Sequence, residues 1–489
     1  MSNTFNIDIF SMRSNFTGNE NLFMATTDFD GDTRIGVFGE IGVEDGVRNL
    51  VTEFVGVSWR NAFRRAINRI VFHITSIYLC YNKGKMRIAI FTDIYAPWSN
   101  GGIASSIKAQ KDELEKLGHR VTVFCPGFNA REKNVITVPS YKHLRVNGAV
   151  MARMPDVVEE FVLEKVPDFN KFDVVHVNYE AGCSIAGIRL AKKFGIPLVQ
   201  TMHGREDQAI AMNVPGPFKR LVAGWLNRKH RKYLEHGVRV KRDKYQAPTK
   251  TRAKMWEMMV NHANQADVVT TPSGHFAKKL EHYGVEKPII AMSNGVADEL
   301  VNEDFAEREL EDGAVLKMIW NSRLSREKRI LPFLRAVAEL KRPYILYVYG
   351  CGNDYKRAQR FAKKHGMKVK FYGETPRKKI LARMREAHLG IMASYNFDTQ
   401  GMTLLEAEAT GLPVFFCDPE MMEVVPRESF VIAGGPEPEA MAIALENMPA
   451  EKVAKMSKNM LKNRQEVLQS KQAKKLIAVY RQAIKEAKK

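Results

Sequence analysis

The sequence has no long apolar run, few cysteines and fewer acidic than basic residues. Its longest apolar stretch, Ile70–Tyr81, is interrupted by polar residues and is shorter than the roughly 18 residues that a membrane-spanning helix needs. The first 30 residues are polar and acidic, which argues against a secretory signal. The 5 cysteines are scattered without the spacing of a zinc site or a disulfide framework. Unpaired thiols of this kind are typical of a reducing cytoplasm.

The composition is that of a globular protein with several domains. The chain has 489 residues, of which 45% are hydrophobic, so two to four domains are expected. Its formal net charge of +20 predicts an anionic partner, which could be nucleic acid, a membrane surface or a phosphorylated ligand.

The positive charge is not spread evenly. Residues 1–85 contain 9 basic and 9 acidic residues, so the whole +20 lies in residues 86–489. We treat residues 1–85 as an N-terminal extension for which the periodicity predicts no structure. One hypothesis is an amphipathic extension in which Arg60–Arg69 and Ile70–Tyr81 reinforce membrane contact. The preferred alternative is that translation normally begins at Met86.

From Met86 onward, short apolar strands alternate with amphipathic helices, which predicts α/β layers around parallel sheets. Two series of strands predict two doubly wound domains, at residues 86–300 and 301–469. A basic amphipathic helix is expected over residues 470–489, packing back on the first domain. The predicted strands are Arg87–Thr92, Arg120–Cys125, Asp173–Val177, Leu198–Thr201, Val268–Thr271, Ile289–Met292, Lys317–Asn321, Tyr344–Tyr349, Lys368–Tyr372, Leu389–Ala393 and Val414–Cys417.

Residues 218–260 interrupt this alternation with 13 basic and 3 acidic residues. Phe218, Leu221, Val222 and Trp225 recur at helical spacing, so they would form one apolar face beside lysines and arginines. Such a helix suits the surface of an anionic membrane. The alternative is an ordinary solvated helix packed on its own domain.

Two motifs follow predicted strands of the first domain. Asn100-Gly101-Gly102 comes just before a predicted helix, where glycines let the backbone approach a phosphate. His203 lies two residues after the predicted strand Leu198–Thr201. In a parallel sheet the carboxyl ends of the strands face the ligand, so this histidine is a candidate site residue. Either feature could instead be structural, as a plain turn or a hydrogen-bonded histidine.

Two further motifs lie in the second domain. Arg323 and Lys328 follow the strand Lys317–Asn321, where two cations would suit a diphosphate. A helix is expected to start near Gly401, so the amides of Gly401, Met402 and Thr403 would form an anion site. Asp398 precedes that helix and Glu406 lies in its second turn. The alternatives are a solvated basic loop and ordinary acidic residues of a helix.

These four motifs, in this order, resemble the retaining glycosyltransferases of family 4. The resemblance extends from Met86 to the C-terminus, which is 404 of 489 residues. The family pattern has two glutamates eight apart; here the second is Glu406, and the first is replaced by Asp398. The core Thr399–Thr403 is similar to that of the subgroup that glucosylates diacylglycerol. The resemblance implies the GT-B fold, in which two Rossmann-like domains face a central cleft.

The resemblance also implies a role for each site residue. Gly101 and Gly102 would lie beside the donor phosphates, and Arg323 and Lys328 would neutralise the diphosphate. The amides of Gly401, Met402 and Thr403 would contact phosphates and sugar. Glu406 would hold the ribose, while Asp398 and His203 would contact the sugar. Transfer with retained configuration is expected without a cofactor or a protein-bound metal.

The resulting hypothesis is a peripheral enzyme on the inner face of the cell membrane. It would move a hexose, preferably glucose from UDP-glucose, to a lipid such as diacylglycerol, with residues 218–260 on the anionic leaflet. A first alternative is transfer to a polysaccharide or a lipid-linked oligosaccharide. An alternative of another class is a basic nucleic-acid-binding or membrane scaffold protein; the sequence has no nucleic-acid recognition motif, so no nucleic acid partner is expected.

Overall fold

The structure is a computed structural model of the chain, with two compact units, Met1–Gly84 and Lys85–Lys489. It describes the strands at 7–10, 23–29 and 32–38, and residues 84–99, 101–146, 148–300 and 305–488. In the first unit, β1 (Ile7–Phe10), β2 (Phe23–Phe29) and β3 (Asp32–Phe38) form an antiparallel sheet. These strands were not predicted from the sequence. Its segments Arg60–Arg69 and Ile70–Tyr81 lie outside the described residues.

The first domain of the second unit contains a seven-stranded parallel sheet with the order β12-β11-β10-β9-β4-β5-β6. Helices cover both faces, which explains the nearly continuous apolar runs of its strands. The strands are β4 (Arg87–Thr92), β5 (Arg120–Pro126), β6 (Val135–Val138), β9 (Val174–Asn178), β10 (Leu198–Thr201), β11 (Val268–Thr271) and β12 (Ile289–Ala291). The helices of this domain include α3 (Gly102–Lys116), α4 (Pro155–Lys165), α5 (Gly182–Phe194), α6 (Glu206–Asn213), α8 (Lys250–Ala263) and α9 (Gly274–His282).

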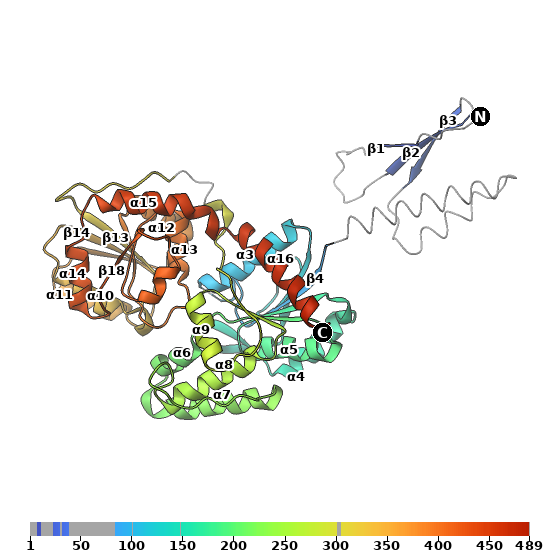
Figure 1. Cartoon of the computed structure of the whole chain (residues 1–489), viewed down its shortest axis with the longest axis horizontal. Helices are drawn as coiled ribbons and strands as arrows, with labels where there is room; N and C mark the ends of the chain where they lie inside the picture. Colours follow the sequence, from blue (N-terminus) through green and yellow to red (C-terminus); the bar gives the residue numbers. More distant parts are fainter. Residues whose placement is uncertain are drawn as a thin grey trace. The chain divides into compact units, whose positions relative to one another are not determined.

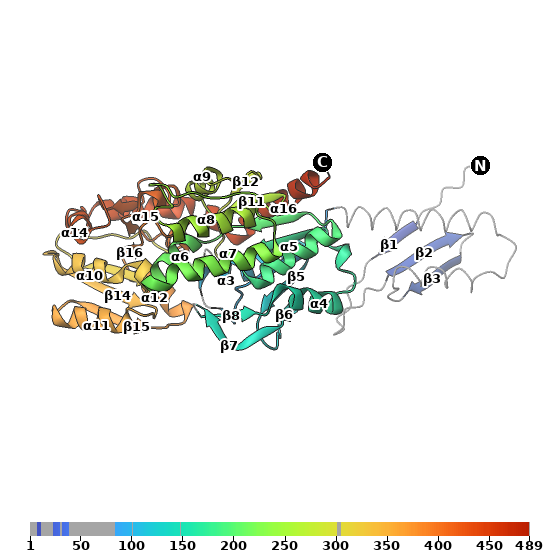
Figure 2. The ribbon, with the colours of Figure 1, turned by 90° about the horizontal axis from the view of Figure 1, so that it is seen from below.

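A small antiparallel hairpin lies near one edge of this sheet. It consists of β7 (Ser140–Val146) and β8 (Ala149–Ala152), and Figure 2 shows it near β6. Neither β6 nor the hairpin was predicted from the sequence.

The second domain contains a six-stranded parallel sheet with the order β15-β14-β13-β16-β17-β18. Two apolar clusters, one on each face, include Trp320 with Phe333 and Ile319 with Leu404. The strands are β13 (Leu316–Asn321), β14 (Tyr344–Tyr349), β15 (Val369–Gly373), β16 (Leu389–Met392), β17 (Val414–Phe416) and β18 (Phe430–Ile432). The helices are α10 (Ile330–Ala338), α11 (Tyr355–Lys364), α12 (Arg377–Glu386), α13 (Met402–Ala409), α14 (Pro438–Glu446) and α15 (Lys452–Asn463).

The C-terminal helix α16 (Gln469–Glu486) leaves the second domain and packs on the first. Figure 1 shows it beside α3. Leu476 and Tyr480 are fully buried with residues of β4 and β5. The Tyr480 hydroxyl also lies 2.8 Å from Nδ1 of His176, a buried residue of β9. The last helix is therefore part of the first domain's core.

Both parallel sheets confirm the predicted α/β class. Each of the 11 predicted strands corresponds to an observed strand with bounds that differ by at most one residue. The edge strand β18 was not predicted.

Candidate active site

The loops at the carboxyl ends of the two sheets contact each other. The Thr399 hydroxyl of the second domain donates to the backbone carbonyl of His203 in the first, at 2.6 Å. A second contact joins Gly102 to Met402, where a Cβ atom on the glycine would lie 2.4 Å from the methionine Cγ. We call this region the domain junction. It brings together motifs that are far apart in the sequence.

The glycine loop of the first domain requires its glycines for two different reasons. Gly101 has a φ of 138°, a conformation that L side chains rarely adopt. Gly102 begins α3, and the methionine at 402 fills the space that its side chain would need. The predicted loop therefore lies against the start of α13. Its first residue, Asn100, is outside the described residues.

Arg323 and Lys328 lie in the loop that follows β13, as predicted, but in different surroundings. The Arg323 side chain is 53% exposed and lies 3.5 Å from the buried Glu327 carboxylate. The Lys328 side chain is only 16% exposed, and its ammonium lies 2.6 Å from the Asp398 carboxylate. The arginine is thus open to a ligand, whereas the lysine already has an anionic partner.

Asp398 connects this loop to the segment before α13. One carboxylate oxygen accepts from Lys328, and the other accepts a hydrogen bond from Ser394. The carboxylate is only 12% exposed, so solvent screens its charge little. The replacement of glutamate by aspartate in the family pattern therefore keeps a fixed negative charge at this position.

The helix α13 begins one residue after the predicted Gly401, which has a φ of 76°. Among the described residues, no side chain caps its first turn, so backbone N–H groups there are available to an anion. Glu406 accepts from Asn321 at 3.0 Å and pairs with Arg377 at 3.2 Å. Burial raises the pKa of Glu406, and both partners oppose that rise.

Arg323, Lys328, Asp398 and Glu406 form what we call the charged edge of the junction. All four come from the second domain, and each has an oppositely charged neighbour. This arrangement suits a ligand with several charges and hydroxyls, because the ligand can exchange contacts with groups that are already held in place.

His203 lies on the other side of the junction and is 6% exposed. Its Nε2 lies 2.8 Å from Oδ1 of Asn178, an oxygen that can only accept, so Nε2 donates. Burial lowers the pKa of His203 to about 4, which keeps the ring neutral at pH 7. Its buried Nδ1 has no partner among the described residues. The ring can therefore accept one further hydrogen bond.

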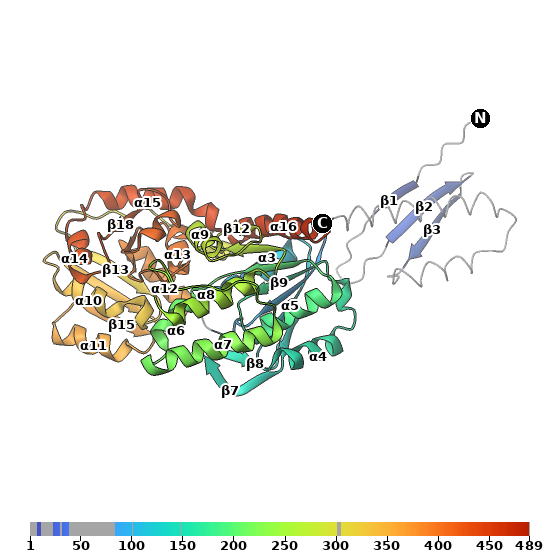
Figure 3. The same ribbon diagram turned by 60° about the horizontal axis from the view of Figure 1, so that its bottom comes forward.

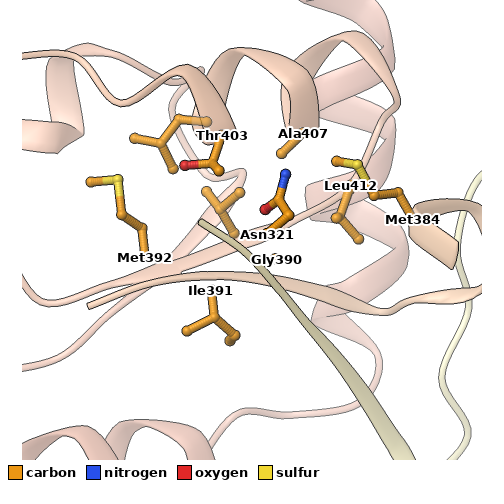
Figure 4. A pocket seen from close by; sticks show the side chains of 10 residues that line it. Asn321, Met384, Gly390, Ile391, Met392, Thr403, Ala407 and Leu412 are labelled. Carbon is orange, nitrogen blue, oxygen red and sulfur yellow. The ribbon is translucent and has the colours of Figure 1, made fainter. Parts of the chain in front are cut away.

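A narrow pocket lies directly beneath α13. Figure 4 shows Asn321 between Thr403 and Ala407, with Met392 and Ile391 nearby. The pocket is mostly apolar and none of the charged edge lines it. It therefore belongs to the packing that supports the helix, and it positions the amide that holds Glu406.

Comparison with protein families agrees with this geometry. Residues 100–300 match the model of Glycosyltransferase Family 4, and residues 301–467 match that of Glycosyl transferases group 1. The two models together span about three quarters of the chain, with their boundary between the two parallel sheets. The chain belongs to glycosyltransferase family 4. It is an enzyme with the GT-B fold.

Curated relatives and solved structures are similar to this family 4 glycosyltransferase. Alpha-monoglucosyldiacylglycerol synthase of Streptococcus pneumoniae is 27% identical over 67% of this chain and 70% of the relative. The protein of the same name from Acholeplasma laidlawii is 26% identical over 67% of this chain and 79% of the relative. The structure of Anabaena Alr3699/HepE with UDP and glucose has a TM-score of 0.56 at 16% identity, covering 81% of this chain and 99% of that one. The structural likeness supports the fold alone.

Some functional candidates of this glycosyltransferase were not found from the sequence. Arg377 and Asn321 hold Glu406 but come from other elements, so only the fold brings them together. Glu180 is 6% exposed and close to Glu206. The only available signal was its position two residues after β9, at the carboxyl end of a buried strand.

Proposed function

We propose that this glycosyltransferase transfers glucose from UDP-glucose to a diacylglycerol-like lipid on the inner face of the cell membrane, with retained α configuration. The names of both curated relatives support the lipid acceptor. The Anabaena structure was solved with UDP and glucose, and we take the same nucleotide and sugar for the donor in this proposal. Among the described residues, no helix is long and apolar enough to cross a membrane. In this proposal the enzyme contacts the lipid through an exposed surface of the first domain.

The observation on which the proposal rests is the exposed apolar face of α7 (Lys219–Tyr233). Phe218, Leu221 and Trp225 are 56%, 68% and 58% exposed. Three large apolar side chains at helical spacing are costly to leave in water, since each would gain about 1.5–3 kcal/mol from burial. Figure 3 shows α7 alongside α8, which covers its other side.

Basic residues flank this apolar face. Arg220 and Arg228 are exposed on α7, and the Lys229 ammonium lies 5.6 Å from the centre of the Trp225 ring. A tryptophan beside lysine and arginine is typical of helices that lie at the membrane interface. Each basic residue near an anionic leaflet contributes about 1 kcal/mol.

The candidate membrane surface is narrower than the predicted segment 218–260. The helix α8 occupies residues 250–263, and most of its side chains are buried, including Met255 and Trp256. Residues of that helix form the core of the domain and are not available to a bilayer. We therefore restrict the proposal to α7 and the residue before it.

The charged edge would bind the donor in this reaction. Arg323 and Lys328 would neutralise charge on the diphosphate as it leaves, and the amides at the start of α13 would add donors. Glu406 would accept from ribose hydroxyls. Asp398 and His203 would contact the sugar, one from each domain.

The decisive experiment incubates the purified full-length chain with radiolabelled UDP-glucose and anionic vesicles that contain diacylglycerol. We expect a labelled glycolipid and sedimentation of the enzyme with the vesicles. The double variant Leu221→Ser/Trp225→Ser should reduce both by about tenfold or more, because two exposed anchors are lost.

The matched control is Ile443→Ser, since Ile443 is 62% exposed on α14, a helix of the second domain. This control should bind vesicles and transfer glucose like the wild type. Absence of labelled glycolipid, together with transfer to a polysaccharide or to a lipid-linked oligosaccharide, would contradict the proposed acceptor.

A further inference from the structure

Unpartnered polar atoms gather on the first-domain side of the junction. Five buried atoms without a hydrogen-bond partner among the described residues belong to four residues there: Asn178 Nδ2, both Glu180 carboxyl oxygens, Gln200 Oε1 and His203 Nδ1. Buried polar groups without partners are rare and cost about 1–3 kcal/mol each. So many in one place indicate a site whose partner is a ligand.

The site lies beside the charged edge. The strands β9 and β10 are parallel neighbours in which Asn178 pairs with Thr201, so Glu180 and His203 both follow adjacent strands at their carboxyl ends. The backbone carbonyl of His203 accepts from Thr399, the neighbour of Asp398 in sequence. Asn178, Glu180 and His203 therefore form an opposite side of the same junction, which we call the neutral edge.

The backbone around Glu180 is held in place by residues from other elements. Asp93, after β4, accepts from the N–H groups of Ala181 at 3.2 Å and Cys183 at 2.8 Å. The Tyr179 carbonyl accepts from Gln200 at 3.4 Å, and Tyr179 has a φ of 97°. A positive φ costs a bulky residue energy and is found most often at functional sites. The Glu180 carboxyl is therefore positioned by its surroundings although it has no partner of its own.

The charge around Glu180 limits what it can bind. Burial, followed by the nearby carboxyls of Glu206 and Asp93, raises the pKa of Glu180 well above its usual range, which favours the protonated, neutral form of its carboxyl. A protonated carboxyl has one O–H donor and also accepts. A phosphate at this position would meet the carboxyls of Glu180, Glu206 and Asp93, which disfavour an anion. A hydroxyl group, which both donates and accepts, fits the carboxyl and the free Nδ1 of His203.

We propose that Glu180 is a substrate-binding residue whose carboxyl, with the His203 ring, binds a hydroxyl group at the junction. The hydroxyl belongs either to the hexose being transferred or to the acceptor that attacks it. This inference requires only that the enzyme is a glycosyltransferase. It does not depend on the lipid acceptor of the proposed function.

The test measures transfer from UDP-glucose by the wild type, Glu180→Leu and Glu180→Gln. Leucine cannot bind a hydroxyl, so its kcat/KM should fall by about tenfold or more. Glutamine can still donate and accept, so it should keep part of the rate. Because leucine removes an unpartnered buried carboxyl, the thermal unfolding midpoint of Glu180→Leu should be unchanged or higher. A residue with only a structural role would lose stability instead.

Hydrolysis of UDP-glucose without acceptor distinguishes the two sources of the hydroxyl. If the hydroxyl is on the hexose, Glu180→Leu reduces hydrolysis and transfer alike. If it is on the acceptor, hydrolysis is unchanged and the acceptor KM rises. Gln472→Leu is the control, since Gln472 is a buried residue of α16 whose side-chain oxygen also has no partner among the described residues.

Two results would overturn the proposal. One is wild-type transfer and hydrolysis by Glu180→Leu. The other is a lower unfolding midpoint together with a rate that recovers fully at low temperature, which would show a structural role. If the wild type uses an acceptor other than diacylglycerol, the kcat/KM of each Glu180 variant is compared with that of the wild type using that acceptor. The inference about Glu180 then stands or falls independently of the lipid.

Discussion

The two sides of the domain junction satisfy their polar groups in opposite ways. On the charged edge, Lys328 and Asp398 already neutralise each other, and Glu406 has both Arg377 and an amide as partners. On the neutral edge, Glu180 and His203 are buried with atoms that have no partner. The four charges of the charged edge are paired without a ligand, whereas the neutral edge has buried atoms without a partner among the described residues.

This difference matches two kinds of substrate group. A nucleotide diphosphate is a strong anion, and charges that are held ready can exchange partners with it at little cost. A hydroxyl is neutral and is recognised best by groups that lose their only hydrogen bond when it is absent. The charged edge would therefore provide most of the rate, and the neutral edge the choice of hydroxyl.

The largest effect is expected from Lys328→Met on the charged edge. The change removes the cation that holds Asp398 and would face the diphosphate, so kcat/KM for sugar transfer should fall by about 10²–10³-fold. Steady-state kinetics with the donor varied would measure it. Lys356→Met on the exposed side of α11 is the control for loss of one positive charge and should retain full activity. A loss below threefold would contradict the importance of the charged edge.

The charged edge could be found from the sequence, whereas most of the neutral edge could not. Arg323 and Lys328 follow an apolar strand, and Asp398 and Glu406 lie on either side of Gly401, the residue before α13. These patterns are local, because each can be recognised from a few neighbouring residues. By contrast, the isolation of Glu180 depends on which side chains of other strands surround it, and spacing along the chain does not reveal this.

The same limit explains why the predicted membrane surface was too wide. The charge of residues 218–260 suggested one exposed basic surface that includes α8. However, Met255 and Trp256 are buried, so α8 packs inside the domain. The strands were easier to predict because the central ones, such as β9 and β10, are buried on both faces. Strands such as β4, β10 and β14 thus have the same bounds in sequence and structure.

The next largest effect is expected from Gly102→Ala, which introduces a clash with the Met402 side chain at the contact between the two domains. The new Cβ atom would lie 2.4 Å from Cγ and 2.6 Å from Cβ of Met402, so one side must move. Overpacking of this kind costs about 1–3 kcal/mol, and we expect kcat to fall by about tenfold or more.

The double variant Gly102→Ala/Met402→Gly should restore much of this loss in kcat, because a glycine at 402 lacks both the Cγ and the Cβ atom that clash. Gly216→Ala is the control, since nothing lies within 4 Å of its added Cβ atom. Equal losses in the single and double variants would show that the two residues do not oppose each other across the junction.

The neutral edge should also respond to acid through His203. Its pKa is lowered from 6.5 to about 4, so the stability it contributes is complete above pH 6.5 and is lost as the pH falls toward 4. At pH 5 this loss is about 2 kcal/mol, since one pKa unit corresponds to 1.36 kcal/mol. Urea unfolding of His203→Gln should therefore show a fall in stability from pH 7.5 to pH 5 that is smaller by about that amount. His143→Gln, at an exposed histidine, is the matched control.

The smallest effect is expected from Glu406→Gln, and it separates binding from catalysis on the charged edge. Glutamine keeps an oxygen for Asn321 but loses the charge that pairs with Arg377. A charge-assisted hydrogen bond to the ribose becomes a neutral one, which costs about 1.4 kcal/mol. We expect the donor KM to rise about tenfold while kcat changes little, and Glu439→Gln on α14 to change neither. If kcat and kcat/KM fell equally, Glu406 would act only in the transition state, and the division between a donor-binding edge and a hydroxyl-selecting edge would need a third, catalytic role.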